Sequence, residues 1–298
     1  MITSTQNAKI KHLTELRDKS RTRNKEGLMI AEGFRIFDEA PENLIKEIYV
    51  EEGTYAQMQN EGSAPSDYFG RAMAKIEKCR SLGCFFETVS DSVMQKASDT
   101  STPQGIIFVC RQPDFSFEDL VRNIPEIKPG TGSVAAEAKP RTGSVVAEAK
   151  PTKGNILILE DIQDPGNLGT MMRTAEAAGM SGVIMSKKCA DIYNPKTVRS
   201  TMGGIFRVPH IYTEDLLGTV NALKKEGFRI YATDLDADGE YDKVDYSGRC
   251  GILIGNEGNG LSREMIENSD TRVIIPMCGE IESLNAAVAA ALMMYISR

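Results

Sequence analysis

Polar residues gather in three segments of the second half of the chain, each directly after an apolar run. The first runs from Glu160 to Arg173 and reads Glu-Asp-Ile-Gln-Asp-Pro-Gly-Asn-Leu-Gly-Thr-Met-Met-Arg. Its Asp-Pro-Gly favours a tight turn. The turn places Asn167 near a helix start, where asparagine caps backbone N–H groups, and Arg173 one to two turns further on. This is either a capped turn with a surface arginine, or an amide and a guanidinium that converge on a phosphate or a ribose.

The other two segments are rich in glycine and small residues. Ile252 to Ser262 reads Ile-Leu-Ile-Gly-Asn-Glu-Gly-Asn-Gly-Leu-Ser, and its glycines let a ligand approach the backbone closely. The spacing differs from the Gly-x-Gly-x-x-Gly of dinucleotide sites, and no P-loop lysine follows. In the third segment a polar loop follows Ile275-Pro, and Ser283 or Asn285 opens an alanine-rich helix. Taken singly, the second segment is explained by an ordinary flexible turn and the third by a plain buried helix.

Scarce residues exclude several kinds of site. The two histidines, His12 and His210, are far apart in the chain, which argues against a histidine metal site or a Ser-His-Asp triad. The six cysteines form no C-x-x-C pair, so the sequence supports neither a zinc ribbon nor a thioredoxin-like site. Isolated cysteines are typical of a reducing compartment. Because no apolar run is long enough to span a membrane and no secretory signal is present, we expect a soluble, cytoplasmic protein without a metal.

Charge is distributed unevenly along the chain. The 298 residues carry a formal net charge of −7. Residues 1–25 nevertheless hold seven basic residues against only Glu15 and Asp18; the basic ones are Lys9, Lys11, Arg17, Lys19, Arg21, Arg23 and Lys25. Because phosphate affinity depends on the local field, this segment is either part of an RNA-binding surface or a solvated helix face.

The organisation of the chain predicts two domains and a linker. Residues 1–112 mix helix-like and strand-like stretches, which predicts a small α/β domain. Residues 113–152 contain an eleven-residue tandem repeat rich in Pro, Gly, Ala and Ser, which predicts a linker. In residues 153–298, helix-like segments separate short apolar runs, which indicates βαβ units and a parallel sheet. The predicted strands there are Ile156–Glu160, Gly182–Ser186, Arg229–Thr233, Gly251–Gly255 and Arg272–Pro276. Such sheets bind ligands at the carboxyl ends of their strands.

Together, the three segments resemble the three sequence motifs of the SpoU (TrmH-type) branch of the SPOUT RNA methyltransferases. The matching residues are Asp164-Pro-Gly-Asn-Leu-Gly169 with Arg173, Gly255-Asn-Glu-Gly258, and Ile275-Pro-Met277 with Glu282-Ser-Leu-Asn285. Asn194-Pro-Lys196 with Arg199-Ser200 resembles the stretch between the first two motifs. The N-terminal Ile2-Thr-Ser4, Asn7 and Ala31-Glu-Gly33 resemble the family's substrate-binding domain more weakly. The eleven-residue repeats depart from the family pattern.

The resemblance implies a fold and a cofactor. The expected architecture is a C-terminal SPOUT domain, with a parallel sheet and a deep trefoil knot, plus the small N-terminal α/β domain. It also implies a homodimer and S-adenosylmethionine bound within the knot. On this sequence, Gly255, Ile275, Met277 and Leu284 would hold the cofactor, mostly through backbone groups.

The resemblance further implies methyl transfer to a ribose 2′-hydroxyl of RNA, and the two-domain layout favours ribosomal RNA. Because a guanidinium is a reluctant base, Arg173 would grip the adjacent phosphate and stabilise the developing alkoxide, with the partner subunit as its possible source. Asn167, Ser283 and Asn285 would orient the ribose, and Glu257 would support its loop or aid proton removal.

Four alternatives stay open on the sequence. The substrate is transfer RNA, or the methyl group goes to a base nitrogen. In a third reading the chain is an RNA-binding protein without catalysis, which the intact Asn167, Arg173 and Asn285 argue against. A nicotinamide enzyme is disfavoured by the glycine spacing.

Overall fold

The computed structural model describes residues 1–61, 68–122, 154–237 and 239–298. The eleven-residue repeats, and most of the predicted linker 113–152, lie outside the described residues. The described residues form two compact units, Met1–Asp114 with Asp191–Arg207, and Phe115–Ala190 with Val208–Arg298. The sequence-based domain boundaries at 112 and 153 stay a prediction.

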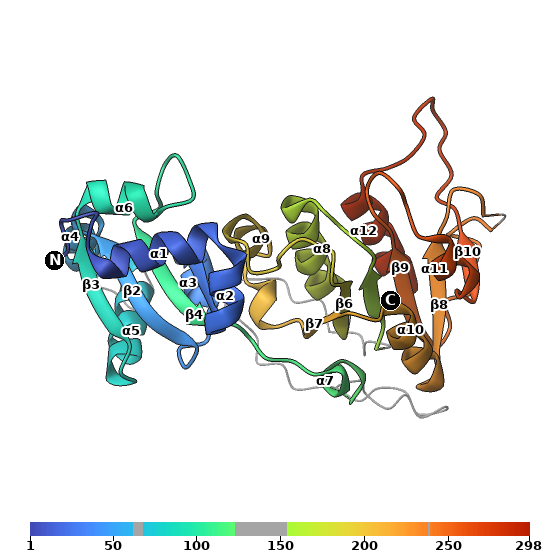
Figure 1. Cartoon of the computed structure of the whole chain (residues 1–298), viewed down its shortest axis with the longest axis horizontal. Coiled ribbons are helices and arrows are strands. Elements are labelled where there is room, and N and C mark those ends of the chain that lie inside the picture. Colours follow the sequence, from blue (N-terminus) through green and yellow to red (C-terminus); the bar gives the residue numbers. More distant parts are fainter. Residues whose placement is uncertain (62–67, 123–153, 238) are drawn as a thin grey trace. The chain divides into compact units, whose positions relative to one another are not determined.

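The first unit is built on a mixed four-stranded sheet (Figure 1). Its strands are β1 (Leu28–Glu32), β2 (Ile45–Glu51), β3 (Phe85–Val89) and β4 (Ile106–Arg111), in the order β1-β4-β2-β3. β4 runs antiparallel to β1 and β2, whereas β2 and β3 are parallel. The helices of this unit are α1 (Ala8–Asp18), α2 (Ser20–Glu26), α3 (Phe34–Glu39), α4 (Glu52–Glu61), α5 (Tyr68–Ser81), α6 (Asp91–Ala97) and α9 (Pro195–Ser200). The α/β composition predicted from the sequence is confirmed.

Helix α1 is fixed to the first unit by one apolar face. Ile10, Leu13 and Leu16 recur at helical spacing and are fully buried in a core shared with the sheet. Asn7 caps the helix, because its side chain accepts a hydrogen bond from the backbone N–H of Lys9 at 2.9 Å. Three of the seven basic residues of the segment, Lys9, Lys11 and Arg17, therefore lie on a helix whose apolar face belongs to the core of this unit.

Residues 191–207 pack within the first unit, although the residues directly before them in the chain belong to the second unit. The anchor is Arg23, whose side chain is 2% exposed and pairs with Asp191 at 2.6 Å. The same guanidinium donates to the carbonyl oxygens of Leu16 and Arg17 at 2.7 and 2.8 Å. Every polar group of this buried pair thus has partners, as a buried charge requires.

The second unit is built on a six-stranded sheet in which every paired strand is parallel, as the sequence predicts. The order is β10-β8-β9-β5-β6-β7. The strands are β5 (Ile156–Leu159), β6 (Gly182–Ser186), β7 (His210–Thr213), β8 (Phe228–Thr233), β9 (Arg249–Ile254) and β10 (Thr271–Val273). β7 was not predicted from the sequence, because it is short and three of its four side chains are only half-buried.

Helices cover both faces of this sheet. They are α7 (Phe117–Arg122), α8 (Pro165–Ala178), α10 (Leu216–Lys225), α11 (Arg263–Glu267) and α12 (Ala286–Ser297). Ile156 and Ile158 pack with α10 residues such as Val220, whereas α12 packs against α8 and β9 (Figure 1). Burial on both faces explains why these strands are continuous apolar runs. Among the described residues, no helix is both long and apolar enough to cross a membrane.

The strand order creates a switch point between β5 and β9. From β5 the chain proceeds outward through β6 to β7, and it then returns on the other side of β5 through β8 and β9. Loops that leave two adjacent parallel strands in opposite directions open a crevice at their carboxyl ends, where open α/β sheets bind ligands. The polar loops that follow Leu159 and Ile254 begin at this crevice.

Candidate functional site

The loop after β5 leads into helix α8, whose cap differs from the prediction. The side chain of Asp164 accepts from the backbone N–H of Asn167 at 2.7 Å, so Asp164 is the N-cap and Asn167 lies in the first turn. The expectation that Asn167 caps the helix is therefore wrong. Aspartate caps as well as asparagine does, and Pro165 is favoured directly after the cap. As a consequence, the amide of Asn167 is available for contacts outside its own helix.

The loop after β9 is a tight turn that requires glycine at its first position. A Cβ at Gly255 would lie 2.2 Å from the carbonyl carbon of Gly260, closer than any real contact. Asn256 and Gly260 exchange backbone hydrogen bonds of 3.0 and 2.9 Å across the turn. The Asn256 side chain also donates to the carbonyl oxygen of Asp161 at 2.7 Å, which ties this loop to the loop after β5.

The third loop joins β10 to α12. The sequence left open whether Ser283 or Asn285 opens this helix, and the structure assigns the cap to Asn285. Its side-chain oxygen accepts from the backbone N–H groups of Ala287 and Val288 at 2.9 and 3.3 Å. The cap fixes the asparagine, and its NH₂ group then points away from the helix toward a partner.

A chain of side-chain hydrogen bonds connects all three loops. The NH₂ group of Asn285 donates to the amide oxygen of Asn167 at 3.0 Å, and the NH₂ group of Asn167 donates to Glu257 at 3.0 Å. Glu257 also accepts from the backbone N–H groups of Gln163 and Asp164 at 3.0 and 3.1 Å. Three segments far apart in sequence thus meet through three of the predicted site residues.

Glu257 is held in its ionised form. Partial burial acts to raise the pKa of its carboxyl group, but the hydrogen bonds from Gln163, Asn167 and Asp164 outweigh burial and lower the pKa. A carboxylate that is already stabilised by several donors accepts a proton reluctantly. Of the two roles expected for Glu257, support of the loops fits these contacts better than proton removal.

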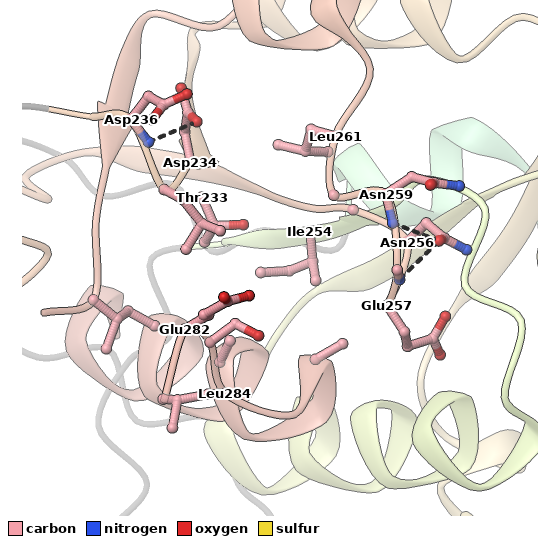
Figure 2. Close-up of a pocket in the computed structure, with 18 of the residues that line it drawn as sticks. Thr233, Asp234, Asp236, Ile254, Asn256, Glu257, Asn259, Leu261, Glu282 and Leu284 are labelled. Atoms are coloured by element: carbon pink, nitrogen blue, oxygen red, sulfur yellow. Dashed lines mark hydrogen bonds between the residues drawn. The ribbon is translucent and has the colours of Figure 1, made fainter. Parts of the chain in front are cut away.

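The loop after β9 and the loop before α12, together with residues at the carboxyl end of β8, enclose a cavity of about 500 Å³ (Figure 2). Of the residues predicted for the cofactor, Gly255, Ile275, Met277 and Leu284 all line it, and Ile254 and Leu261 add further apolar surface. Its volume lies in the range of small-molecule sites.

The charged residues described in the lining of the cavity are all acidic. Carboxylates line it at Asp234, Asp236, Glu257 and Glu282, and no Lys, Arg or His is among the described lining residues (Figure 2). Arg272 contacts Asp234 at 3.2 Å from outside the lining. A cavity of this charge favours a cationic ligand over a phosphate.

The remaining predicted site residues are Arg173 and Ser283. Arg173 is exposed on α8 and makes no hydrogen bond or ion pair with the described residues, and it does not line the cavity. Ser283 is exposed and does line the cavity, with its hydroxyl unpaired among the residues described. Both side chains are therefore accessible to a ligand.

Comparison with known proteins identifies the family. Residues 154–295 match the model of the SpoU rRNA Methylase family, and residues 7–107 match the MRM3-like substrate binding domain. The chain is also similar to the 23S rRNA (guanosine(2553)-2'-O)-methyltransferase RlmP of Bacillus subtilis, with 31% identity over 99% of this chain and 97% of the relative. The chain belongs to the SpoU rRNA methylase family. The family prediction from the sequence is confirmed.

Two solved structures are similar to this chain in fold, and a further relative is similar in part of its sequence. An AdoMet-bound rRNA methyltransferase from Sinorhizobium meliloti covers 100% of this chain and 96% of its own, at 26% identity and a TM-score of 0.75. A structure described as an RNA 2'-O ribose methyltransferase is 26% identical, with coverage of 99% and 97% and a TM-score of 0.69. A putative TrmH family tRNA/rRNA methyltransferase from Staphylococcus saprophyticus is 39% identical over 47% of this chain and 56% of its own length.

Sequence analysis missed one wall of the cavity in this SpoU-family chain. Thr233, Asp234, Leu235 and Asp236 line it from the carboxyl end of β8. The signal was present, since the strand predicted at Arg229–Thr233 ends there and the carboxyl ends of parallel strands carry ligand sites.

The basic N-terminal segment is only partly available to RNA. Four of its seven cations form ion pairs: Lys9 with Glu47, Arg17 with Asp18, Lys19 with Glu15 and Arg23 with Asp191. Lys11, Arg21 and Lys25 are exposed and make no ion pair with any described residue. An RNA-binding surface in this segment would therefore depend on these three side chains.

Proposed function

We propose that this SpoU-family chain transfers a methyl group from S-adenosylmethionine to a ribose 2′-hydroxyl of ribosomal RNA. The observation that carries the proposal is the cavity at the carboxyl ends of β8, β9 and β10. It is lined from the second and third motif loops and tied to the first by the Asn285–Asn167–Glu257 hydrogen bonds. The relative from B. subtilis is named as an enzyme of this activity on 23S rRNA.

The cavity suits S-adenosylmethionine in size and charge. This cofactor supplies a methyl group bonded to a positively charged sulfonium, which makes the methyl carbon electrophilic. Gly255, Ile275, Met277 and Leu284 would hold it through backbone groups and apolar contacts. The carboxylates around the cavity would favour a cationic ligand, and the absence of a described basic lining residue would keep phosphates out.

The candidate residues divide into those that hold the loops and those that remain open to substrate. Hydrogen bonds join the side chains of Asn167, Asn285 and Glu257. These residues would therefore position the ribose through the loops that they connect. Ser283 has an unpaired hydroxyl for direct contact with the ribose. Arg173 would grip the phosphate next to the target and stabilise the alkoxide that develops as the proton leaves.

We also propose that the chain forms a homodimer and that its second unit contains a trefoil knot. Helix α12 exposes Val288, Tyr295 and Ile296, at 48%, 47% and 40%, along one face. Exposed apolar side chains at helical spacing favour a homodimer that covers them, and a partner subunit would then lie near the cavity. The path from β10 at one edge of the sheet back to α12 on α8 and β9 is consistent with the proposed trefoil knot. An RNA substrate would place the protein in the cytoplasm.

Mass spectrometry of modified nucleosides tests the activity. Purified protein would be incubated with methyl-labelled S-adenosylmethionine and unmodified 23S rRNA transcript, with transfer RNA in parallel. We expect label in a 2′-O-methyl nucleoside from the ribosomal RNA, and mapping would show whether the site corresponds to the guanosine named for the B. subtilis relative. Label on a base, on transfer RNA alone, or on no nucleoside would contradict the proposal.

A further inference from the structure

A second cavity, of about 490 Å³, lies within the first unit among α3, α4, α5, α6 and the loop before β4. Three aromatic side chains line it: Phe34, Tyr68 and Phe69. Their ring centroids are 5.6 to 5.8 Å apart, and the rings are mutually inclined by 54° to 71°. Phe34 is 6% exposed, whereas Tyr68 is 49% exposed. The cluster therefore has a rigid buried base and one ring surface open to a ligand.

Amide groups line the same cavity. Gln104 and Gln95 are exposed, and their side-chain amides make no hydrogen bond with the described residues. An amide offers both a donor and an acceptor, which is the pattern that the polar edge of a nucleobase requires. Aromatic rings combined with such groups are the common means by which proteins hold unstacked bases of RNA.

Two glycines with positive φ make room for these side chains. A Cβ at Gly33 (φ +107°) would lie 2.3 Å from the amide oxygen of Gln104, and a Cβ at Gly105 (φ +78°) would lie 2.5 Å from the hydroxyl of Thr54. The backbone N–H of Gln104 is fixed by Glu32 at 2.9 Å. The close approach of Gln104 and Thr54 to the backbone in this cavity thus depends on glycine at positions 33 and 105.

The charges indicate which part of a nucleotide the cavity suits. Its charged lining residues are Glu51 and Asp91, and no Lys, Arg or His is among those described. Glu51 is already held by the backbone N–H groups of Gly53 and Thr54. Carboxylates repel a phosphate but accept hydrogen bonds from the N–H groups of a base. Arg35 is exposed and has no ion pair with the described residues, so it is available to a phosphate outside the cavity.

We propose that this cavity holds an unstacked base of the RNA substrate, with its ring against Tyr68 and its polar edge toward Gln104 and Gln95. The inference rests on the proposed function, because it takes RNA as the substrate. The match of residues 7–107 to a substrate binding domain covers this cavity but assigns no residue in it. The cavity would thus place the RNA by gripping a base other than the one whose ribose is methylated.

Substitution of Tyr68 and Gln104 tests the inference with 23S rRNA transcript as the probe. Tyr68→Ala should weaken RNA affinity by about tenfold or more, as loss of one stacked base does, and Gln104→Ala by several fold. Tyr68→Phe keeps the ring and should retain affinity. The matched control is Tyr55→Ala, since Tyr55 lies on the same helix as Thr54 but packs on Phe86 outside the cavity.

Two further readouts separate a base contact from a structural role. The slope of RNA affinity against salt should be unchanged in Tyr68→Ala, because stacking releases no phosphate counterions. Affinity for S-adenosylmethionine should also be unchanged. RNA affinity of Tyr68→Ala within twofold of Tyr55→Ala, or an altered salt slope, would overturn the base site while leaving methyl transfer by the wild type intact. If the wild type binds no ribosomal RNA, the proposed function fails, and the same variants measured with transfer RNA decide the base site.

Discussion

The two cavities of this chain have nearly equal volumes, about 500 and 490 Å³, but are built differently. The cavity of the second unit lies where parallel strands end, and glycine-rich backbone and carboxylates form much of its wall. The cavity of the first unit lies between helices, and aromatic rings and amides form its wall. Neither described lining contains a Lys, Arg or His residue, so neither cavity is suited to a phosphate. The volumes therefore do not indicate which ligand each cavity binds. The residues that line them do: one lining suits a cationic cofactor and the other suits a neutral base.

The largest effect is expected outside both cavities, at Arg173. Arg173→Ala should lower the rate of methyl transfer by roughly 100- to 1000-fold, the usual cost of one transition-state donor. Affinity for S-adenosylmethionine should stay within a few fold, because Arg173 does not line the cavity. Arg263→Ala is the matched control, since Arg263 is 91% exposed and, among the described residues, forms an ion pair with Glu267 alone. Single-turnover rates combined with calorimetry measure both quantities, and unchanged turnover in Arg173→Ala would remove its assigned role.

Gly255→Ala should damage the cofactor cavity and leave the base cavity intact. Because a Cβ at Gly255 meets the backbone of Gly260 at 2.2 Å, the turn must open. We expect at least a tenfold loss of affinity for S-adenosylmethionine, measured by calorimetry, with RNA affinity unchanged. Gly279→Ala is the control, because a Cβ there has no atom within 4 Å. Equal affinities in the two variants would show that the turn does not shape the cofactor site.

The sequence predicted the central strands of the second unit better than the edge strands β7 and β3, for physical reasons. The central strands are buried on both faces and therefore appear as uninterrupted apolar runs such as Gly182–Ser186, which the structure reproduces residue for residue. The three motif loops follow such strands, so topology alone places them at one edge. In the first unit, β3 (Phe85–Val89) was not predicted, since only one of its five side chains is buried and the apolar pattern is weak.

Details of the site depended on contacts that sequence spacing does not encode. Asp164 and Asn167 are both good N-cap residues three positions apart, and the choice between them follows from Pro165, which occupies the first helical position. The hydrogen bonds from Asn285 to Asn167 and from Asn167 to Glu257 span 118 and 90 residues. The base cavity was missed because Phe34, Tyr68 and Gln104 are far apart in the chain and form no recognisable motif.

The basic segment offers a test that is independent of both cavities. Replacing Lys11, Arg21 and Lys25 together by Ala should reduce the slope of log affinity against log salt by about 2 to 3, if each contacts one phosphate. Deletion of residues 1–25 is a poor test, since it removes Ile10, Leu13 and Leu16 from the core. The control replaces Lys78 and Arg80, whose charges are already paired with Glu42 and Glu77. An unchanged slope in the triple variant would show that this segment does not contact RNA.

The smallest effect is expected when Glu257 is protonated at low pH, and the quantity it changes is the affinity for S-adenosylmethionine. The pKa of the Glu257 carboxyl group is lowered in the folded protein. The contribution of the ionised group to cofactor affinity is therefore present above the ordinary carboxyl pKa of 4.5 and is lost as pH falls through the lowered value. Affinity for S-adenosylmethionine should therefore be constant from pH 7 to about 5 and decline at lower pH. In Glu257→Gln this decline should be smaller, because Asp234, Asp236 and Glu282 are then the remaining carboxylates that line the cavity. Parallel declines in both proteins would assign the pH dependence to another group.

The central claim is that three distant loops of the second unit meet around a cationic methyl donor. Parallel calorimetric titrations of the wild-type protein with S-adenosylmethionine and with NAD test it most directly. The account predicts a saturable binding heat with one S-adenosylmethionine per chain and none with NAD. No heat with S-adenosylmethionine, or binding of NAD in its place, would contradict it.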